Sequence, residues 1–578
     1  MESPSALSYD FSIELVAPAK APPAQAAPVQ RDISATRALV VDGQPGSRSL
    51  LMAQLRDIGV GMVKHAACPS DARVLLERGA YDFVFCEASF PDPDESGHDL
   101  LEELRRERLL PYGTAFIMVT AEADYGAVRE AAESVVDGYL LRPYSTQNLS
   151  DRVHEARRRK QALADVYAAV EAGRTDHAIE LAMARVTAKG SYWRLCARLA
   201  AELLLQAERL DEAVDLLQSL AEDSTMGWAR LALSRARAAR GETALARREI
   251  ETLVKDSPDY ADAYDVLGML QVDQGEFAGA LETYRTASRL TPGCLLRQQH
   301  NGTLAFYAGA SEEALRCLER VVALGLESRL FDALTLALLA LCGHDLGQAK
   351  AVSRALEQLQ AFQRRHPGSA RLRRMTLVPL TLEALGNGDM AAARAGFQRL
   401  AGEHRSDSFD VEAATLLLAL AARMPADLRH EPELTSLRQD LARRCCVSRV
   451  VSDILVMAAG RDPQTAEIIL TAHAEIHGIA ERAVAMSARQ RPRQAIKLLL
   501  ERGRATLNAK LIDMAAMIAV RHRAALEDAD AMLDLISQLQ ERYCRPVTHL
   551  AGVMRARRPP GALALRGQPA VTRRRPSA

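Results

Sequence analysis

YDFVFCEASFP, residues 81–91, holds the pattern that decides the fold of the amino-terminal part of this chain. A short uninterrupted apolar run, Phe83–Cys86, is followed at once by an acidic residue and then by a loop containing proline. Such a run without polar alternation is typical of a strand buried on both faces of a parallel sheet. Functional side chains of these sheets follow the carboxyl ends of the strands, so Glu87 is the first candidate site residue.

Further apolar runs of the same kind surround this segment. Together with Phe83–Cys86, the expected strands are Arg37–Asp42, Met62–Ala66, Ala115–Val119 and Gly138–Leu141. The expected helices are amphipathic stretches around 46–57, 69–78, 97–107, 124–134 and 146–159. Five strands that alternate with five helices predict a doubly wound, parallel, five-stranded α/β domain over residues 36–158.

The loops after these strands resemble those of response-regulator receiver domains, the CheY-like family. The matching segments are LVVDGQPGSR (39–48), YDFVFCEASFP (81–91), MVTA (118–121) and GYLLRPYS (138–145), in the family's order. They resemble, in turn, the segments with the acidic pair, the phosphorylated aspartate, the hydroxyl switch residue, and the aromatic residue with its lysine and proline. The resemblance implies a receiver-like domain and a role in two-component signal transduction.

Three positions that receivers use for phosphoryl chemistry are altered. The resemblance places Asp42 and Gly43 at the acidic pair, Glu87 at the phosphorylated aspartate and Arg142 at the lysine. Gly43 supplies no carboxylate, and Mg²⁺ is held through oxygen ligands, so we expect weak Mg²⁺ binding and no other cofactor. Arg142 keeps its positive charge but presents a planar fork instead of a compact ammonium group. We therefore expect a pseudo-receiver without catalytic residues.

The switch positions persist, because Thr120 and Tyr139 match the family's switching residues. Glu87 and Arg142 are expected to form a charge-assisted pair that resembles a fixed, phosphorylated state. The alternatives stay open: Glu87 as a solvated loop acid, Tyr139 as a packed aromatic residue, and Thr120 as a cap of the following turn. Asp92 or Asp94 in the PDPDESG loop is a less favoured phosphate acceptor.

A helical repeat begins after residue 159. Ala246, Ile250 and Pro258 recur 34 residues later as Ala280, Tyr284 and Pro292, while Gly268, Ala280, Tyr284 and Ala287 recur as Gly302, Ala314, Leu318 and Val321. The period and the small residues resemble the tetratricopeptide repeat, a helix–turn–helix unit. We expect a repeat array over 159–405 and a divergent helical solenoid or cap over 406–548, where Ala495 marks one more helix pair. HEARRRK (154–160) is expected to be the solvated face of the connecting helix.

Stacked repeats leave a concave surface, so the array is expected to bind proteins. The family resemblance implies that first-helix positions face this groove. These are Asp262, Asp265, Met269, Val272 and Asp273 on one repeat, and Gln299, Thr303, Phe306 and Tyr307 on the next. Aspartates beside apolar groups suit a peptide or helix with basic and apolar residues, although ordinary solvated helix acids explain them equally well.

Composition limits the classes of function. Charged residues make up 25% of the chain, hydrophobic residues 48%, and the formal net charge is -1, as in a soluble, mostly helical protein. The nine cysteines have no metal-binding spacing, and GQPGSR (43–48) lacks the Lys-Ser/Thr of a nucleotide-binding loop. We expect a cytoplasmic protein without a membrane span. Residues 1–35 and the Arg/Pro-rich residues 549–578 are expected to be a disordered leader and tail.

These features favour a non-enzymatic adaptor in two-component signalling. The receiver-like domain would contact a histidine kinase, another regulator or a second copy of itself, and the array would hold an effector protein. One alternative is an active phosphorelay regulator that is phosphorylated at an atypical acidic site. Another is a nucleic-acid-binding regulator that uses the tail, where Arg555 to Ala578 contains seven arginines and no acid. The last alternative ranks lowest because no DNA-binding motif follows the receiver.

Overall fold

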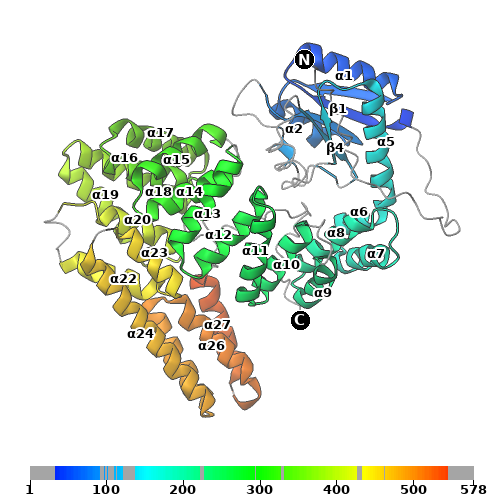
Figure 1. Ribbon diagram of the computed structural model, residues 1–578. Coiled ribbons are helices and arrows are strands. Elements are labelled where there is room, and N and C mark those ends of the chain that lie inside the picture. Colours follow the sequence, from blue (N-terminus) through cyan, green and yellow to red (C-terminus); the bar gives the residue numbers. More distant parts are fainter. Residues whose placement is uncertain are drawn as a thin grey trace, which may run out of the picture.

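An α/β domain and a long helical array make up the computed structural model (Figure 1). It describes residues 33–90, 97, 100–101, 104, 110–111, 113–120, 137–221, 227–292, 294–326, 331–425, 432–460, 462–526 and 528–544. The expected helix 124–134, most of the expected helix 97–107, and nearly all of the predicted leader and tail lie outside these residues.

The α/β domain is built on a parallel sheet with the strand order β2-β1-β3-β4-β5. Its strands are β1 (Arg37–Val41), β2 (Met62–Ala66), β3 (Phe83–Glu87), β4 (Ala115–Thr120) and β5 (Gly138–Leu141), and a short helix η1 (Ile33–Ala35) precedes them. Each predicted strand is confirmed to within one residue at either end. β1 and β3 are buried almost throughout, which explains their continuous apolar sequences.

Of the helices that cover the two faces of this sheet, the described residues include α1 (Pro45–Asp57), α2 (Pro69–Arg78) and α5 (Thr146–Ala162). Alternate strand residues point to opposite faces, so Val40 and Phe85 pack with α1 and α5, while Leu39 and Val84 pack with α2. Figure 1 shows α5 leading from the sheet toward the first helices of the array. The predicted doubly wound α/β fold is confirmed.

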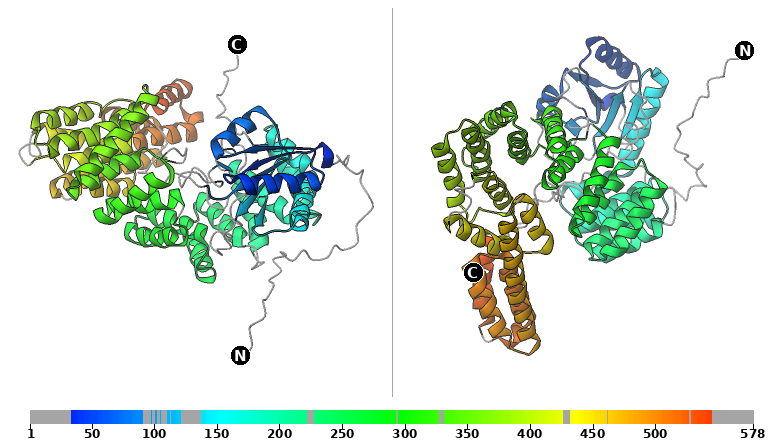
Figure 2. Two further views of the ribbon diagram at one scale, coloured as in Figure 1. Left: turned by 90° about the horizontal axis from the view of Figure 1, so that it is seen from above. Right: turned by 60° about the vertical axis from the view of Figure 1, so that its left-hand side comes forward.

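The array consists of antiparallel helix pairs. Its first part contains α6 (Ala164–Glu171), α7 (Thr175–Thr187), α8 (Trp193–Gln206), α9 (Leu210–Ala221), α10 (Gly227–Ala239), α11 (Thr243–Asp256), α12 (Ala261–Asp273), α13 (Phe277–Leu290), α14 (Leu295–Tyr307), α15 (Ser311–Gly325), α16 (Leu334–Asp345), α17 (Ala349–Arg365), α18 (Ala370–Gly386) and α19 (Met390–Gly402). Figure 2 shows these pairs stacked side by side. The all-α solenoid predicted from the repeat is confirmed.

Left-handed backbone conformations mark the turn inside each helix pair. The residues with positive φ at these turns are Gly173, Glu208, Gly241, Gly275, Gly309, Gly347 and Gly388. Glycine suits this conformation because it lacks a Cβ. A second glycine requirement comes from packing, since a Cβ at Gly268 would lie 2.6 Å from the ring of Tyr284. The repeating small residues of the sequence therefore reflect both turn geometry and close helix contact.

The region after residue 406 begins with α20 (Val411–Ala421), a helix that is buried along its whole length. It packs against α16 and α18. At its amino-terminal end Glu412 accepts hydrogen bonds of 2.6 and 2.7 Å from Arg371, which also donates 2.6 Å to Asp332. At its carboxyl-terminal end Arg423 donates 2.7 Å to Asp345 of α16. α20 therefore fills the inner side of the later repeats.

Further helices complete the molecule beyond α20. They are α22 (Pro432–Cys445), α23 (Arg449–Ala458), α24 (Pro463–Ala488), α25 (Pro492–Thr506), α26 (Ala509–Arg521), the short η2 (Arg523–Ala525) and α27 (Ala529–Tyr543). α24 to α27 form an arm with its own apolar core (Figure 2). Ala495 is fully buried in the pair α25 and α26, as the sequence predicted. Among the described residues, no helix combines the length and the apolar character needed to cross a bilayer.

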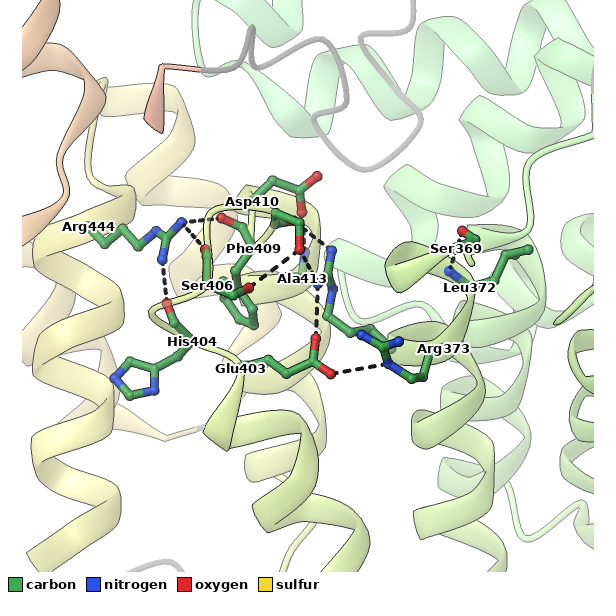
Figure 3. Close-up of polar contacts among 12 residues, drawn as sticks. Ser369, Leu372, Arg373, Glu403, His404, Ser406, Phe409, Asp410, Ala413 and Arg444 are labelled. Atoms are coloured by element: carbon green, nitrogen blue, oxygen red, sulfur yellow. Dashed lines mark hydrogen bonds and ion pairs between the residues drawn. The ribbon is translucent and has the colours of Figure 1, made fainter. Parts of the chain in front are cut away.

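An arginine stabilises the irregular loop that joins α19 to α20. Figure 3 shows Arg444 of α22 directed at backbone carbonyl groups of this loop. Its guanidinium donates hydrogen bonds to the carbonyl oxygens of His404 (2.6 Å), Ser406 (2.8 Å) and Phe409 (2.6 Å). Buried carbonyl groups without a partner are costly, so Arg444 takes the place of regular secondary structure here.

We predict that Arg444→Ala lowers the local free energy of unfolding around α20 and α22 by about 2 to 4 kcal/mol, because the buried carbonyl of Phe409 and the half-buried carbonyls of His404 and Ser406 lose a charged donor. The matched control is Arg443→Ala. Arg443 pairs with Glu475 at 3.0 Å, but both side chains are about 40% exposed (41% and 39%), so the expected loss is below about 0.5 kcal/mol. Hydrogen exchange of the α20 and α22 amides measures both values, and equal protection in the two variants would contradict the assigned role of Arg444.

Candidate functional site

The carboxyl ends of the strands bring the predicted receiver residues to one edge of the sheet. Asp42 follows β1 directly, Glu87 ends β3, and Thr120 ends β4. Thr120 pairs with Leu141 in the parallel register, and Arg142 follows Leu141 along the chain. Parallel strands end at a common edge, so residues far apart in the sequence become neighbours.

Arg142 bridges two carboxylates at this edge. Its Nη2 lies 2.5 Å from Oδ2 of Asp42, and its Nη1 lies 2.9 Å from Oε1 of Glu87. The side chains are largely buried, with exposed fractions of 19% for Arg142, 1% for Asp42 and 11% for Glu87. The planar fork of arginine allows this double contact from two separate nitrogens held in fixed geometry. The predicted pair between Glu87 and Arg142 is confirmed, and Asp42 extends it to a triad.

The remaining polar atoms of Asp42 are also engaged. Its Oδ1 accepts a 2.7 Å hydrogen bond from the backbone N–H of Gln44, and its carbonyl oxygen accepts 2.5 Å from Nη1 of Arg48. Gly43 contributes no carboxylate. Within the described ranges, no group of three or more His, Cys, Asp or Glu side chains is arranged to hold a metal ion. Arg142 occupies one oxygen of each carboxylate, and only Oε2 of Glu87 is left without a hydrogen-bond partner. The described residues at this edge therefore fit Mg²⁺ poorly, since the ion takes several oxygen ligands.

Charge at the triad is unevenly balanced, because two carboxylates share one guanidinium. Burial raises the pKa of Glu87, the charge of Asp42 raises it further, and Arg142 only partly offsets both effects. Burial lowers the pKa of Arg142, but the two carboxylates outweigh this effect and raise it overall. Burial, followed by the charges of Glu87 and Asp42, also raises the pKa of the Cys86 thiol well above its ordinary value. Arg142 therefore stays charged and Cys86 stays a neutral thiol.

The two predicted switch residues lie beside the triad. Thr120 is half-buried at the end of β4, and Tyr139 is half-buried on β5, where it packs against the core on the α2 side of the sheet. Their roles as switch residues stay predictions. Asp92, Asp94 and the Arg-rich residues 555–578 lie outside the described residues, so the alternatives that involve them stay predictions too.

The basic stretch of α5 is only partly solvated, contrary to expectation. His154 and Arg158 are exposed, but Arg159 and Lys160 each form a 2.8 Å ion pair with Asp137, just before β5. Lys160 also lies 5.2 Å from the ring centroid of Tyr167 on α6. These contacts tie the end of α5 to the sheet on one side and to the first repeat helix on the other.

The predicted groove aspartates do not form a free acidic surface. Asp262 and Asp265 of α12 are bound by Arg297 of α14, at 2.5 and 2.9 Å. The exposed side-chain fractions are 10% for Asp262, 12% for Asp265 and 6% for Arg297. The prediction that these two aspartates face a basic ligand is wrong, because the next repeat already supplies a cation. Asp273 is exposed and Met269 is half-buried.

The predicted groove residues of the next repeat are buried in the protein interior. They are Gln299, Thr303, Phe306 and Tyr307 of α14, and Val272 of α12 is buried as well. The guanidinium carbon of Arg423, just beyond α20, lies 5.7 Å from the ring centroid of Phe306. Burial also raises the pKa of Tyr307 above its ordinary value. The expected groove at Phe306 and Tyr307 is therefore wrong, because α20 and α23 pack on this side of the array.

Sequence reasoning missed a small cleft between α8 and α10. Its lining comprises Arg198, Ala201, Glu202, Trp228, Leu231, Ala232 and Arg235. Trp228, Leu231 and Arg235 stand 34 residues before Asp262, Asp265 and Met269. The repeat period that identified the groove positions on α12 therefore marks the same face of α10. Applying the period one repeat earlier would have found these residues.

Comparison with known proteins gives the same division of the chain. Residues 38–154 match the family model of the response regulator receiver domain, and residues 204–270 match that of the tetratricopeptide repeat. Chemotaxis protein CheY-3 of Vibrio cholerae is 30% identical over 115 residues, which cover 20% of this chain and 86% of that protein. Chemotaxis protein CheY of Pseudomonas aeruginosa is 31% identical over 117 residues, which cover 20% of this chain and 92% of that protein.

These matches coincide with the structure, since the first spans the parallel sheet and the second runs from the end of α8 through α9 to α11 and into α12. The receiver relatives are matched over most of their own length, whereas the helical array lies beyond their match. The chain therefore belongs to the response regulator receiver family, and it joins its receiver domain to a tetratricopeptide repeat array.

Proposed function

We propose that this protein is a non-enzymatic adaptor of two-component signalling, whose receiver domain acts through protein contacts instead of phosphoryl transfer. A receiver domain joined to tetratricopeptide repeats indicates a role in two-component signalling that involves protein–protein interactions. The single observation that carries the finer proposal is the guanidinium of Arg142, which bridges Asp42 and Glu87.

Phosphoryl transfer needs cations that offset the charge developing on the transferred group. Here one oxygen of each carboxylate, Oδ2 of Asp42 and Oε1 of Glu87, is engaged by a cation that belongs to the protein and cannot leave. Gly43 removes a further ligand, so the energetic gain from Mg²⁺ binding is small. The domain thereby keeps one charge distribution that does not depend on a phosphoryl donor.

Signal would then pass through binding of a protein partner near Tyr139, on the strand next to the triad. The partner is a histidine kinase, another regulator or a second copy of this chain, and the repeat array holds an effector protein. The ion pairs of Asp137 with Arg159 and Lys160 support this path, because they connect the start of β5 to the helix that enters the array.

We predict that the full chain gains no phosphoryl group when it is incubated with acetyl phosphate and Mg²⁺ and its intact mass is measured. A variant that restores the family's residues, Gly43→Asp with Glu87→Asp and Arg142→Lys, serves as the matched control and should bind Mg²⁺ and become phosphorylated. A phosphoryl group on Glu87 or a nearby aspartate of the unaltered chain would instead support an active phosphorelay regulator.

We also predict that Arg142→Ala lowers the free energy of local unfolding of β1 and β3 by about 3 to 5 kcal/mol at neutral pH, because it leaves two buried carboxylates without a cation. Hydrogen exchange of the strand amides provides the measurement. Adding Glu87→Gln to Arg142→Ala should recover most of the loss, since one buried charge is then removed. If Glu87→Gln does not recover the lost stability, repulsion between the two buried carboxylates is not the cause of the loss in Arg142→Ala.

The loss in Arg142→Ala should depend on pH in a defined direction. Burial and Asp42 raise the pKa of Glu87, so the folded state binds a proton more tightly than the unfolded state. Stability therefore falls as pH rises from the ordinary glutamate pKa through the raised value in the folded protein. The deficit relative to the unaltered chain should be smaller in mildly acidic solution than at neutral pH, and a deficit that grows on acidification would contradict this assignment.

A further inference from the structure

The arm of α24 to α27 ends in a tip where two connections meet. One is the turn after α24, and the other joins α26 to α27. They lie side by side, because Oγ of Ser487 is 2.9 Å from Nε2 of His522, and Nη2 of Arg493 is 3.0 Å from Oδ2 of Asp528. Figure 2 shows this end of the arm projecting away from the rest of the molecule. We call residues 484–494 and 517–530 the tip.

Apolar side chains are exposed at this tip. Met517 is 63% and Val520 64% exposed, the largest values among the large hydrophobic residues that the structure describes, and Val484 is 53% exposed. Their spacing places Met517, Val520 and Arg521 on one face of α26. Ile518 of the same turn is buried in the core of the arm, so the arm does not use this face for its own folding. Neighbouring apolar groups that stay exposed mark an interaction site.

The tip also carries an excess of positive charge. Its sequence contains five arginines against three acids, a formal net charge of +2. Arg489, Arg491 and Arg521 are exposed. Within the part of the chain that the structure describes, their side chains form no ion pair or hydrogen bond. These charges are therefore available to an anion outside the chain.

The other two arginines of the tip are held loosely. Arg493 pairs with Asp528 at 3.0 Å, with exposed side-chain fractions of 66% and 40%. Arg523 pairs with Asp530 at 2.7 Å, with fractions of 65% and 78%. Exposed ion pairs contribute little to stability, because water and salt screen them. An incoming carboxylate can therefore share these arginines without a large loss.

The kinds of residue at the tip favour a protein as its partner. All five cations are arginine and none is lysine, and Met517 stands among them. Protein interfaces are enriched in arginine and methionine and depleted in lysine. Anionic lipids and nucleic-acid phosphates attract lysine and arginine alike. The composition therefore points to a protein surface that is acidic and partly apolar.

Charge disfavours an occupant from this chain. The tip of a second copy carries the same sign, so two tips repel each other. Residues 555–578 contain seven arginines and no acid, so they are repelled as well. A helix with apolar residues on one face and carboxylates beside them matches the tip, because Met517, Val520 and Arg521 are themselves spaced along a helical face.

We propose that the tip binds an acidic amphipathic helix of a protein partner. The apolar face of that helix covers Met517 and Val520, and its carboxylates pair with Arg521 and with the arginines of the turn after α24. This inference rests on the proposed function only in assigning protein binding to the helical part of the chain, and it specifies the chemistry of the partner.

The probe is a capped, labelled amphipathic peptide of Leu, Ala and Glu, and the control peptide has Gln in place of every Glu. With the full chain, we expect saturable binding of the acidic peptide that weakens with added salt, and much weaker binding of the control. Fluorescence anisotropy measures the affinity. Hydrogen exchange locates the site, and the acidic peptide should protect amides at 484–494 and 517–526.

Variants of the full chain separate the tip from the rest of the arm. Arg489→Glu with Arg521→Glu should weaken binding about tenfold or more, because two attractive charges become repulsive. The matched control is Arg502→Glu with Arg504→Glu, the same change of charge at two exposed positions toward the other end of α25. This control should bind as the unaltered chain does.

The apolar contribution is tested in the same way. Met517→Ser with Val520→Ser should weaken binding about fivefold or more, because the apolar face of the peptide loses its contact. The matched control is Leu470→Ser, since Leu470 is 42% exposed on α24 but lies toward the other end of the arm. All of these side chains are exposed, so each variant is expected to fold.

Equal binding of the two peptides, equal losses in the tip variants and their controls, or protection only outside the tip would overturn the proposal. Phosphatidylglycerol vesicles or a DNA duplex that protect the tip while the acidic peptide does not would overturn it in favour of a membrane or a nucleic acid. The phosphorylation and Arg142 experiments test the receiver domain alone, so failure of this inference is distinguishable from failure of the proposed function.

Discussion

A guanidinium held between two largely buried carboxylates joins distant segments at the edge of the sheet, between α12 and α14, and beside α20. Arg142 joins the ends of β1 and β3 through Asp42 and Glu87. Arg297 joins two consecutive repeats, and Arg371 connects α18 with Asp332 and α20. Arginine suits this position because it remains charged and offers several donors in one plane. Each triad also carries one carboxylate more than it has cations, so removing the arginine is far more costly than removing one acid.

The part of the fold that depends on local sequence was predictable. Buried strands such as Phe83–Glu87 are continuous apolar runs, and their ends identify the site edge. The pair of Glu87 with Arg142 followed from the same reasoning, because parallel strands end together. The contact of Arg142 with Asp42 did not follow, since it depends on how far a flexible side chain reaches across the sheet.

The inner side of the array was not predictable, because it is decided by contacts between distant segments. Nothing in the repeat period around Phe306 indicates that a helix more than a hundred residues later packs near it. The same holds for Asp262, whose neutralising partner Arg297 belongs to the next repeat. A periodic pattern identifies which face of a helix is turned inward, but it does not reveal what covers that face. The charge of a groove must therefore be read across repeats.

Because α20 is buried among the later repeats, the helices α6 to α12 and the helices from α13 onward should differ in how they tolerate the gain or loss of a repeat. Repeats that touch only their neighbours behave as a nearly additive chain, in which units can be gained or lost with graded effects on stability. The separate apolar clusters around α6 to α12 have this character. From α13 onward one apolar cluster extends through α20 to α24, so these helices form a single cooperative unit with many long-range contacts. The gain or loss of a repeat should therefore be tolerated among α6 to α12, next to the receiver. Among α13 to α24 the same change should destabilise the whole unit.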